Sequence, residues 1–201
     1  MTREELEAIV EQEYREELSR DSSPTGAYWA YWGVGRLAAM GGELEKAILA
    51  YQKAIAADPT NTMAWQHLGL VYADSKDNEK AIDCFQKCID LQCQGLHITI
   101  EEDNPYFHLG WCYADLGNFA KAEEVFKKDL ELLPAHYNAY LRLARLYYAQ
   151  ERWGELADLL QHALDIAAGT AKEPSEYERK ELEAIKQNLD EVRERLTKAP
   201  G

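Results

Sequence analysis

The stretch Trp65-Gln-His-Leu-Gly-Leu-Val-Tyr72 recurs 41 residues later as Tyr106-Phe-His-Leu-Gly-Trp-Cys-Tyr113. Both copies hold an aromatic residue, a leucine, a glycine and a tyrosine at the same positions. Both are followed at equal distances by an alanine and a phenylalanine: Ala81 and Phe85, then Ala122 and Phe126. Such recurrence is typical of supersecondary units that stack on their neighbours, because one unit alone cannot bury its apolar face. The chain is therefore expected to be a repeat protein.

The pattern extends in both directions in steps of 34 residues. One step back from Gly69 reaches Gly35, and one step forward from Gly110 reaches Ala144. A small residue at each of these positions lets the two helices of a unit approach closely. The predicted units cover residues 28–61, 62–102, 103–136 and 137–170. The last unit is degenerate, because it lacks a turn glycine and a final proline.

This pattern resembles the tetratricopeptide repeat, a helix-turn-helix unit of 34 residues, over about residues 28 to 170. The resemblance implies an all-α fold, a right-handed α-solenoid of antiparallel helix pairs with about ten helices. It also implies a single domain over residues 1–201.

Helices are also expected on both sides of the repeats. Residues 1–24 predict an N-terminal capping helix that ends near Pro24. Residues 174–198 predict a C-terminal capping helix with these apolar positions: Leu182, Ile185, Leu189, Val192 and Leu196. A solenoid needs such ends, with one polar face, to cover its last repeat. The alternative for the last helix is a coiled-coil dimer seam, for which fewer than three heptads is short.

Seven extra residues follow the second helix of the second unit, within 93–102. The helix either continues, with Leu96 and Ile100 in phase, or ends at Gly95 and leaves a loop. We expect a partly extended helix and then a short loop. Asp103 is expected to cap the next helix, with Pro105 in its first turn.

Composition bounds the class of protein. The chain has 201 residues, of which 46% are hydrophobic, and a formal net charge of -14. The negative charge disfavours nucleic acid or an anionic lipid surface as the main partner. The N-terminus is charged, and no apolar run approaches the ~20 residues that cross a bilayer. We expect a cytoplasmic protein that inserts in no membrane.

The resemblance implies that the second, fifth, sixth, ninth and twelfth residues of each unit line a concave groove. The candidate binding residues in these positions are Trp29, Trp32, Arg36, Gln66, His67, Leu70, Asn104, Phe107, His108, Trp111, Asn138, Arg142, Arg145 and Tyr148. Aromatic residues that the helix pair does not need for its own packing indicate a surface that another molecule covers. The alternative is that Trp29 and Trp32 pack under the N-terminal helix, and that Phe107 and Trp111 fill the interior of a tight superhelix.

Arginines flank these aromatic residues on an otherwise acidic chain, at Arg36, Arg142 and Arg145. A peptide with apolar anchors and carboxylates would suit such a groove. Some members of the family hold a chaperone's C-terminal carboxylate with lysine, asparagine and arginine in these positions. No lysine occupies them here, so that tail is not the expected ligand. His67 and His108 share the sixth position, and their protonation is a possible control on acidic ligands.

The cysteines allow two interpretations, a zinc site or buried thiols. Cys84, Cys88, Cys93 and His97 invite a zinc site, because thiolate and imidazole bind zinc. A continuous helix would spread these residues around its circumference, so we predict buried thiols and no metal or other cofactor.

The five histidines are scattered along the chain, and no nucleophile, base and orienting residue can be assembled from the motifs. We expect a non-catalytic protein-protein interaction scaffold that binds a peptide or partner segment in the concave groove, as a monomer or weak homodimer. The alternatives are a structural, homo-oligomeric assembly element, or a chaperone-like protein for a secretion or assembly system.

Overall fold

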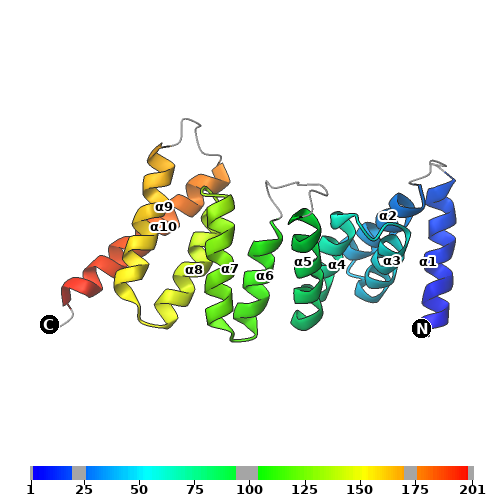
Figure 1. The fold of residues 1–201 in the computed structure, drawn as a ribbon, viewed down its shortest axis with the longest axis horizontal. Coiled ribbons are helices and arrows are strands. Elements are labelled where there is room, and N and C mark those ends of the chain that lie inside the picture. The colour runs from blue at the N-terminus through cyan, green and yellow to red at the C-terminus, as the bar shows by residue number, and fades with distance from the viewer. Residues whose placement is uncertain (1, 20–25, 94–103, 170–175, 199–201) are drawn as a thin grey trace. The chain divides into compact units, whose positions relative to one another are not determined.

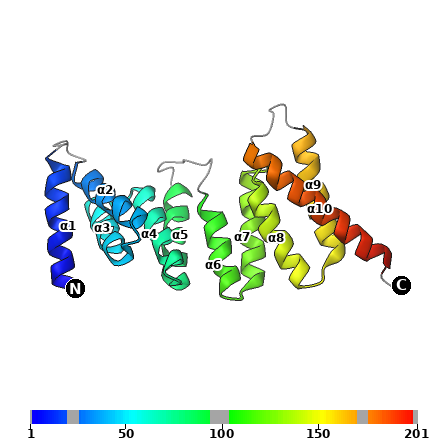
Figure 2. The same ribbon diagram turned by 180° about the vertical axis from the view of Figure 1, so that it is seen from behind.

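The computed structural model describes residues 2–19, 26–93, 104–169 and 176–198. Within these ranges the chain forms ten α-helices and no strand, as the resemblance predicted (Figures 1 and 2). The helices are α1 (Arg3–Leu18), α2 (Gly26–Met40), α3 (Leu44–Ala57), α4 (Thr62–Asp74), α5 (Asn78–Cys93), α6 (Pro105–Asp115), α7 (Phe119–Leu132), α8 (Tyr137–Ala149), α9 (Trp153–Gly169) and α10 (Glu176–Lys198). No helix among them is both long enough and apolar enough to span a membrane.

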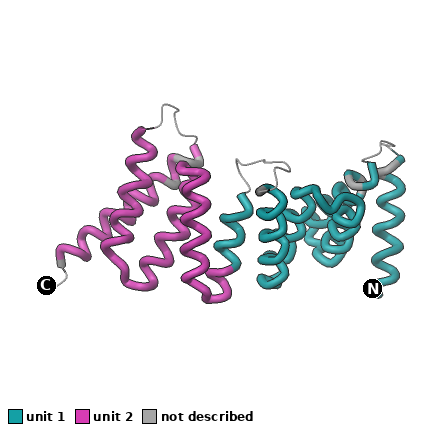
Figure 3. Tube along the Cα trace, viewed as in Figure 1, with its two compact units in different colours: residues 1–112 teal, residues 113–201 magenta. Residues whose placement is uncertain are grey.

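The chain divides into two compact units, residues 1–112 and residues 113–201, with the boundary inside α6 (Figure 3). The expected single domain, its repeat boundaries and its capping helices stay predictions. The insertion lies mostly outside the described residues, apart from the end of α5 at Cys93.

In unit 1, α2 pairs with α3 and α4 pairs with α5, and α1 packs on α2 and α3. The predicted close approach of paired helices occurs at two glycines. A Cβ added to Gly35 would lie 2.9 Å from the ring of Tyr51, and one added to Gly69 would lie 2.8 Å from Phe85. Both distances are too short for a real Cβ, so each glycine is needed where an aromatic ring of the second helix presses on the first.

Helix α1 is joined to the first pair by apolar and polar contacts. Val10 is fully buried in a cluster with Val34, Leu49 and Ala50. The carboxylate of Glu11 accepts hydrogen bonds from the Tyr31 hydroxyl and the Lys53 ammonium group. These bonds lower the pKa of Glu11. The N-terminal helix is therefore part of the core of unit 1.

In unit 2, α7 packs on α8, α8 on α9, and α10 on both α9 and α8. The core includes Leu143, Leu156 and Leu160 from the fourth predicted repeat. From α10 the buried residues are Ile185, Leu189 and Val192, whereas Leu196 remains 43% exposed. The predicted apolar face of the last helix is thus buried in the middle of the helix, and its last turn extends past that contact.

Candidate functional site

The aromatic residues of the first two repeats meet on one surface of unit 1, where α2 lies against α4. The rings of Trp29 and Trp32 pack edge to face with centroids 5.7 Å apart, and Trp32 meets His67 in the same way at 5.5 Å. The guanidinium of Arg36 lies 5.5 Å from the centre of the Trp32 ring, a cation–π distance. We call Trp29, Trp32, Arg36 and His67 the aromatic strip. Trp29 remains 42% exposed, so α1 does not cover it as the alternative expected.

Exposed apolar side chains continue the strip along α2. Leu37 is 58% exposed and Met40 is 76% exposed, and both lie within one or two turns of Arg36. Gly33 lies between Trp29 and Leu37, and a Cβ added there would meet no described atom within 4 Å. Unlike Gly35, this glycine is not explained by packing inside the described chain. The strip therefore has one exposed apolar side, and no side chain projects from it at Gly33.

The α4 residues of the predicted site divide into two groups. His67 donates from Nδ1 to the carbonyl oxygen of Met63 at 2.7 Å, which orients its ring toward Trp32. Leu70 is half-buried, whereas Gln66 is only 6% exposed. Gln66 is thus the most buried of the three, and its place on the binding surface stays a prediction.

On α6, the predicted residues are mostly used in local packing. Asn104 is 4% exposed, and its side chain accepts a hydrogen bond from the backbone amide of Tyr106 at 3.2 Å. It acts as the N-cap of α6, and its ligand role stays a prediction. His108 stacks on Phe85 with ring centroids 5.4 Å apart, and Phe107 packs edge to face on His108. Trp111 is the most open of these side chains, at 39%.

The four predicted residues of unit 2 lie along α8. Asn138 and Arg142 are half-buried, and Arg145 and Tyr148 are exposed. Leu141, Arg145 and Tyr148 border a pocket of about 270 Å³ between α8 and α10. Two of the four predicted residues, Arg145 and Tyr148, thus border this pocket, and their binding role stays a prediction.

The other side of Tyr148 is held by two residues that sequence reasoning missed. Arg195 of α10 donates a hydrogen bond to the Tyr148 hydroxyl at 2.9 Å. Its guanidinium lies 5.2 Å from the centre of the Tyr148 ring and 5.1 Å from that of Trp153. The sequence could have indicated Trp153, because it begins its helix at the same repeat position as the apolar residues Leu44 and Phe119. Arg195 lies in α10, outside the repeats, so the repeat pattern could not indicate its role.

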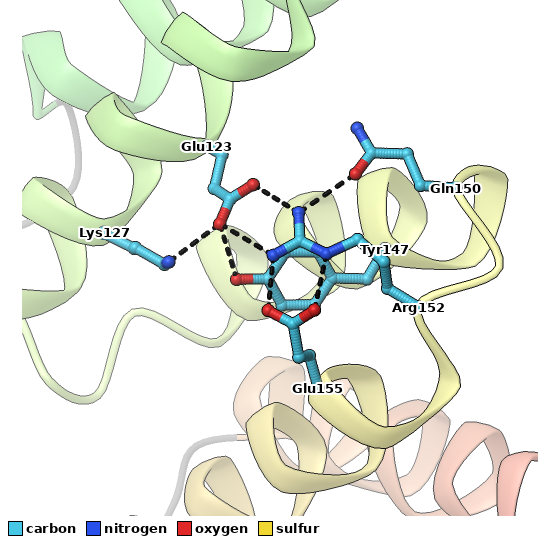
Figure 4. Close-up of polar contacts among 6 residues, drawn as sticks. All are labelled: Glu123, Lys127, Tyr147, Gln150, Arg152 and Glu155. Carbon is cyan, nitrogen blue, oxygen red and sulfur yellow. Dashed lines mark hydrogen bonds and ion pairs between the residues drawn. The ribbon is translucent and has the colours of Figure 1, made fainter.

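A polar cluster joins α7, α8 and the start of α9 (Figure 4). Its six members are Glu123, Lys127, Tyr147, Gln150, Arg152 and Glu155. Arg152 Nη1 lies 2.5 Å from Glu123 Oε2, and its guanidinium lies 4.2 Å from the centre of the Tyr147 ring. The Tyr147 hydroxyl donates to Glu123 at 3.0 Å, and the ammonium group of Lys127 donates at 2.7 Å. The hydrogen bonds from Arg152 are the main reason that the pKa of Glu123 falls to about 2. This arrangement is structural: it fixes three helices and leaves little of Glu123 open to a ligand.

The cysteines form no reactive centre in the part of the chain that the structure describes. Cys84, Cys88 and Cys112 are buried, and burial raises the pKa of Cys84 and Cys88 to about 12. These thiols stay protonated at neutral pH and pack as small apolar groups. The described residues hold no cluster of three histidine, cysteine or carboxylate side chains that could bind a metal ion. Residue His97 of the zinc alternative, like Asp103, lies outside the described residues.

The antiparallel helix pairs define a helical-repeat protein. Family models described as the tetratricopeptide repeat match residues 59–135 and 139–175, and a further TPR repeat model matches residues 35–76. The chain belongs to the tetratricopeptide repeat proteins, as the recurring motif indicated. Superkiller protein 3 of Schizosaccharomyces pombe is 27% identical over 150 residues, which are 72% of this chain and 10% of that protein. The chain thus spans about a tenth of that relative's length.

Solved structures resemble this chain in fold. The crystal structure of MamA has a TM-score of 0.64 and 24% identity, with 76% of this chain and 83% of that chain covered. YrrB, described as a TPR protein with an unusual peptide-binding site, has a TM-score of 0.61 and 19% identity, covering 92% of this chain and 89% of that chain. At these identities the likeness establishes the fold, and the binding properties must come from this chain's own residues.

Proposed function

We propose that the chain is a non-catalytic interaction scaffold whose aromatic strip holds a segment of a partner protein. The observation that carries this proposal is the open, mostly apolar surface of α2, with Trp29 42%, Leu37 58% and Met40 76% exposed. Exposed aromatic and long apolar side chains gathered on one helix are typical of docking surfaces. The peptide-binding site described for YrrB, a protein of similar fold, is consistent with this role.

The chemistry of the strip indicates the kind of segment. The two tryptophans and His67 offer ring faces and edges to an apolar side chain. Arg36 is exposed next to Trp32 and presents a fixed positive charge on a chain with a net charge of -14. A carboxylate beside the apolar anchor would pair with that guanidinium. The open space over Gly33 would let the backbone of the segment approach α2.

The proposal is tested with peptides selected by the purified chain from a random dodecapeptide display library. We expect selected peptides to share an aromatic or long aliphatic residue next to Asp or Glu. The variant Trp29→Ala should weaken their binding at least tenfold in calorimetry. Phe119→Ala is the matched control, because Phe119 is also 42% exposed but lies outside the strip. Equal binding by the wild type and Trp29→Ala, or loss with Phe119→Ala alone, would refute the proposal.

A further inference from the structure

The pocket between α8 and α10 has an apolar floor and a polar rim. Leu156 and Val192, each 2% exposed, and Ala144, at 5%, lie at the bottom. Arg145 from α8 and Asn188 and Glu191 from α10 lie at the edge and are exposed to solvent. A pocket of about 270 Å³ with these walls fits one large apolar side chain together with its backbone polar groups.

The polar side chains of the rim have no bonding partner within the described residues. The side chains of Arg145, Asn188 and Glu191 make no hydrogen bond or ion pair with any residue in the described ranges. Other arginines of unit 2 behave differently: Arg152 is bound to Glu123, and Arg193 donates to Gln161 at 2.8 Å. Arg145 and Glu191 also carry opposite charges on two different helices, yet they do not pair with each other. The rim therefore presents a cation, an anion and an amide whose hydrogen-bonding capacity is open.

One wall of the pocket is held in place before any ligand arrives. Tyr148 borders the pocket, and Arg195 fixes it from the side through the 2.9 Å hydrogen bond to its hydroxyl. The same guanidinium stacks against Trp153, whose ring meets Tyr148 edge to face at 5.1 Å. A wall that is already ordered loses little conformational entropy on binding.

We infer that this pocket binds a leucine-like side chain of a peptide segment whose neighbouring residue is acidic. The apolar side chain occupies the floor, and the acidic neighbour pairs with Arg145. Glu191 accepts a backbone N–H of the segment, and the Asn188 amide donates to a backbone carbonyl. Helix α10 is then a wall of a binding site as well as a cover for the last repeat. The inference rests on the proposed function, because it assigns a second place where a segment of the same chemistry binds.

The test uses the full chain labelled with ¹³C at alanine methyl groups, titrated with acetyl-Leu-Asp-amide. The methyl signals of Ala144 and Ala184, which border the pocket, should shift and saturate at millimolar peptide or below. Ala184→Phe, which fills the pocket from α10, should weaken binding at least tenfold. Ala120→Phe places the same ring at an exposed site on α7 and should leave binding unchanged.

The charge assignment has its own pair of variants. Arg145→Gln should abolish the preference for acetyl-Leu-Asp-amide over acetyl-Leu-Asn-amide, and Lys186→Gln, which removes a charge elsewhere on α10, should retain it. Acetyl-Ala-Asp-amide should bind at least tenfold more weakly than the leucine peptide. Absence of saturable shifts, or equal binding by Ala184→Phe, would overturn the inference.

The two proposals fail separately. Trp29→Ala should not change the binding of the dipeptide probe, because Trp29 does not border the pocket. If the selected dodecapeptides need Trp29 but the probe does not bind, only the pocket inference is wrong. If the probe binds as expected but the dodecapeptides ignore Trp29, the proposed function of the strip is wrong.

Discussion

At the scale of single residues, four turns between consecutive helices share one backbone geometry, although their residues differ. A residue with positive φ stands in each turn, at Gly42, Lys76, Gly117 and Glu151, with φ between 56° and 74°. The backbone amide after each of them donates to a carbonyl five residues back, as Arg152 does to Tyr147 at 2.9 Å. This is the Schellman geometry that ends a helix. The second and fourth units thus have the same turn as the other two, although Lys76 and Glu151 stand where the others have glycine.

Replacing the non-glycine residues in these turns should stabilise the protein. A side chain in the left-handed region destabilises the fold by about 1–2 kcal/mol. Glycine removes this strain, but it loses more conformational entropy on folding, which offsets part of the gain. Lys76→Gly and Glu151→Gly should each raise the free energy of unfolding by about 0.5 kcal/mol, measured by urea denaturation. Gly117→Ala should lower it. Destabilisation by both glycine variants would contradict the left-handed assignment.

At the scale of the element, two helical glycines with different surroundings make a matched pair. A methyl group at Gly69 would meet the Phe85 ring, whereas one at Gly33 would point into open space. Gly69→Ala should therefore cost about 1–3 kcal/mol through overpacking. Gly33→Ala should raise stability by up to about 1 kcal/mol, because alanine favours the helix. Thermal and urea unfolding of both variants measure this, and a loss of stability in Gly33→Ala would show that the residue packs inside the fold.

The polar cluster of Figure 4 predicts a pH dependence at the same scale. The fold lowers the pKa of Glu123 from 4.5 to about 2, so its contribution is complete above 4.5 and is lost as the pH falls toward 2. Allowing for screening by solvent, this contribution is about 1–2 kcal/mol.

Between pH 5 and pH 2, the free energy of unfolding of wild type should therefore fall more than that of Glu123→Gln. Glu124→Gln is the control, since Glu124 is 65% exposed in a surface ion pair with Lys128. Parallel pH profiles for wild type and Glu123→Gln would contradict the role of the cluster.

At the scale of the whole molecule, the sequence predicted the ten helices, whereas the binding role of the groove positions stays a prediction. The helices could be predicted from a recurring pattern, because Gly35 and Gly69 each pack against an aromatic ring 16 residues further along the chain. The same register placed Trp29 and Arg36 in candidate groove positions, and both side chains are exposed. The burial of Gln66 and Asn104 was not predicted, because side-chain burial and N-capping depend on local packing that the repeat register does not encode. The contact of Arg195 with Tyr148 joins residues 47 positions apart, which no short pattern predicts.

The central claim is that an acidic, apolar segment of a partner lies on the aromatic strip with its carboxylate against Arg36. The most direct measurement is a charge exchange across this contact, by calorimetry with a peptide selected by the wild-type chain. Arg36→Glu should weaken binding of the acidic peptide at least tenfold, and changing the peptide's acidic residue to lysine should restore binding to that variant alone. If Arg36→Glu binds the acidic peptide as tightly as wild type, or the lysine peptide gains nothing, the partner does not lie on this strip.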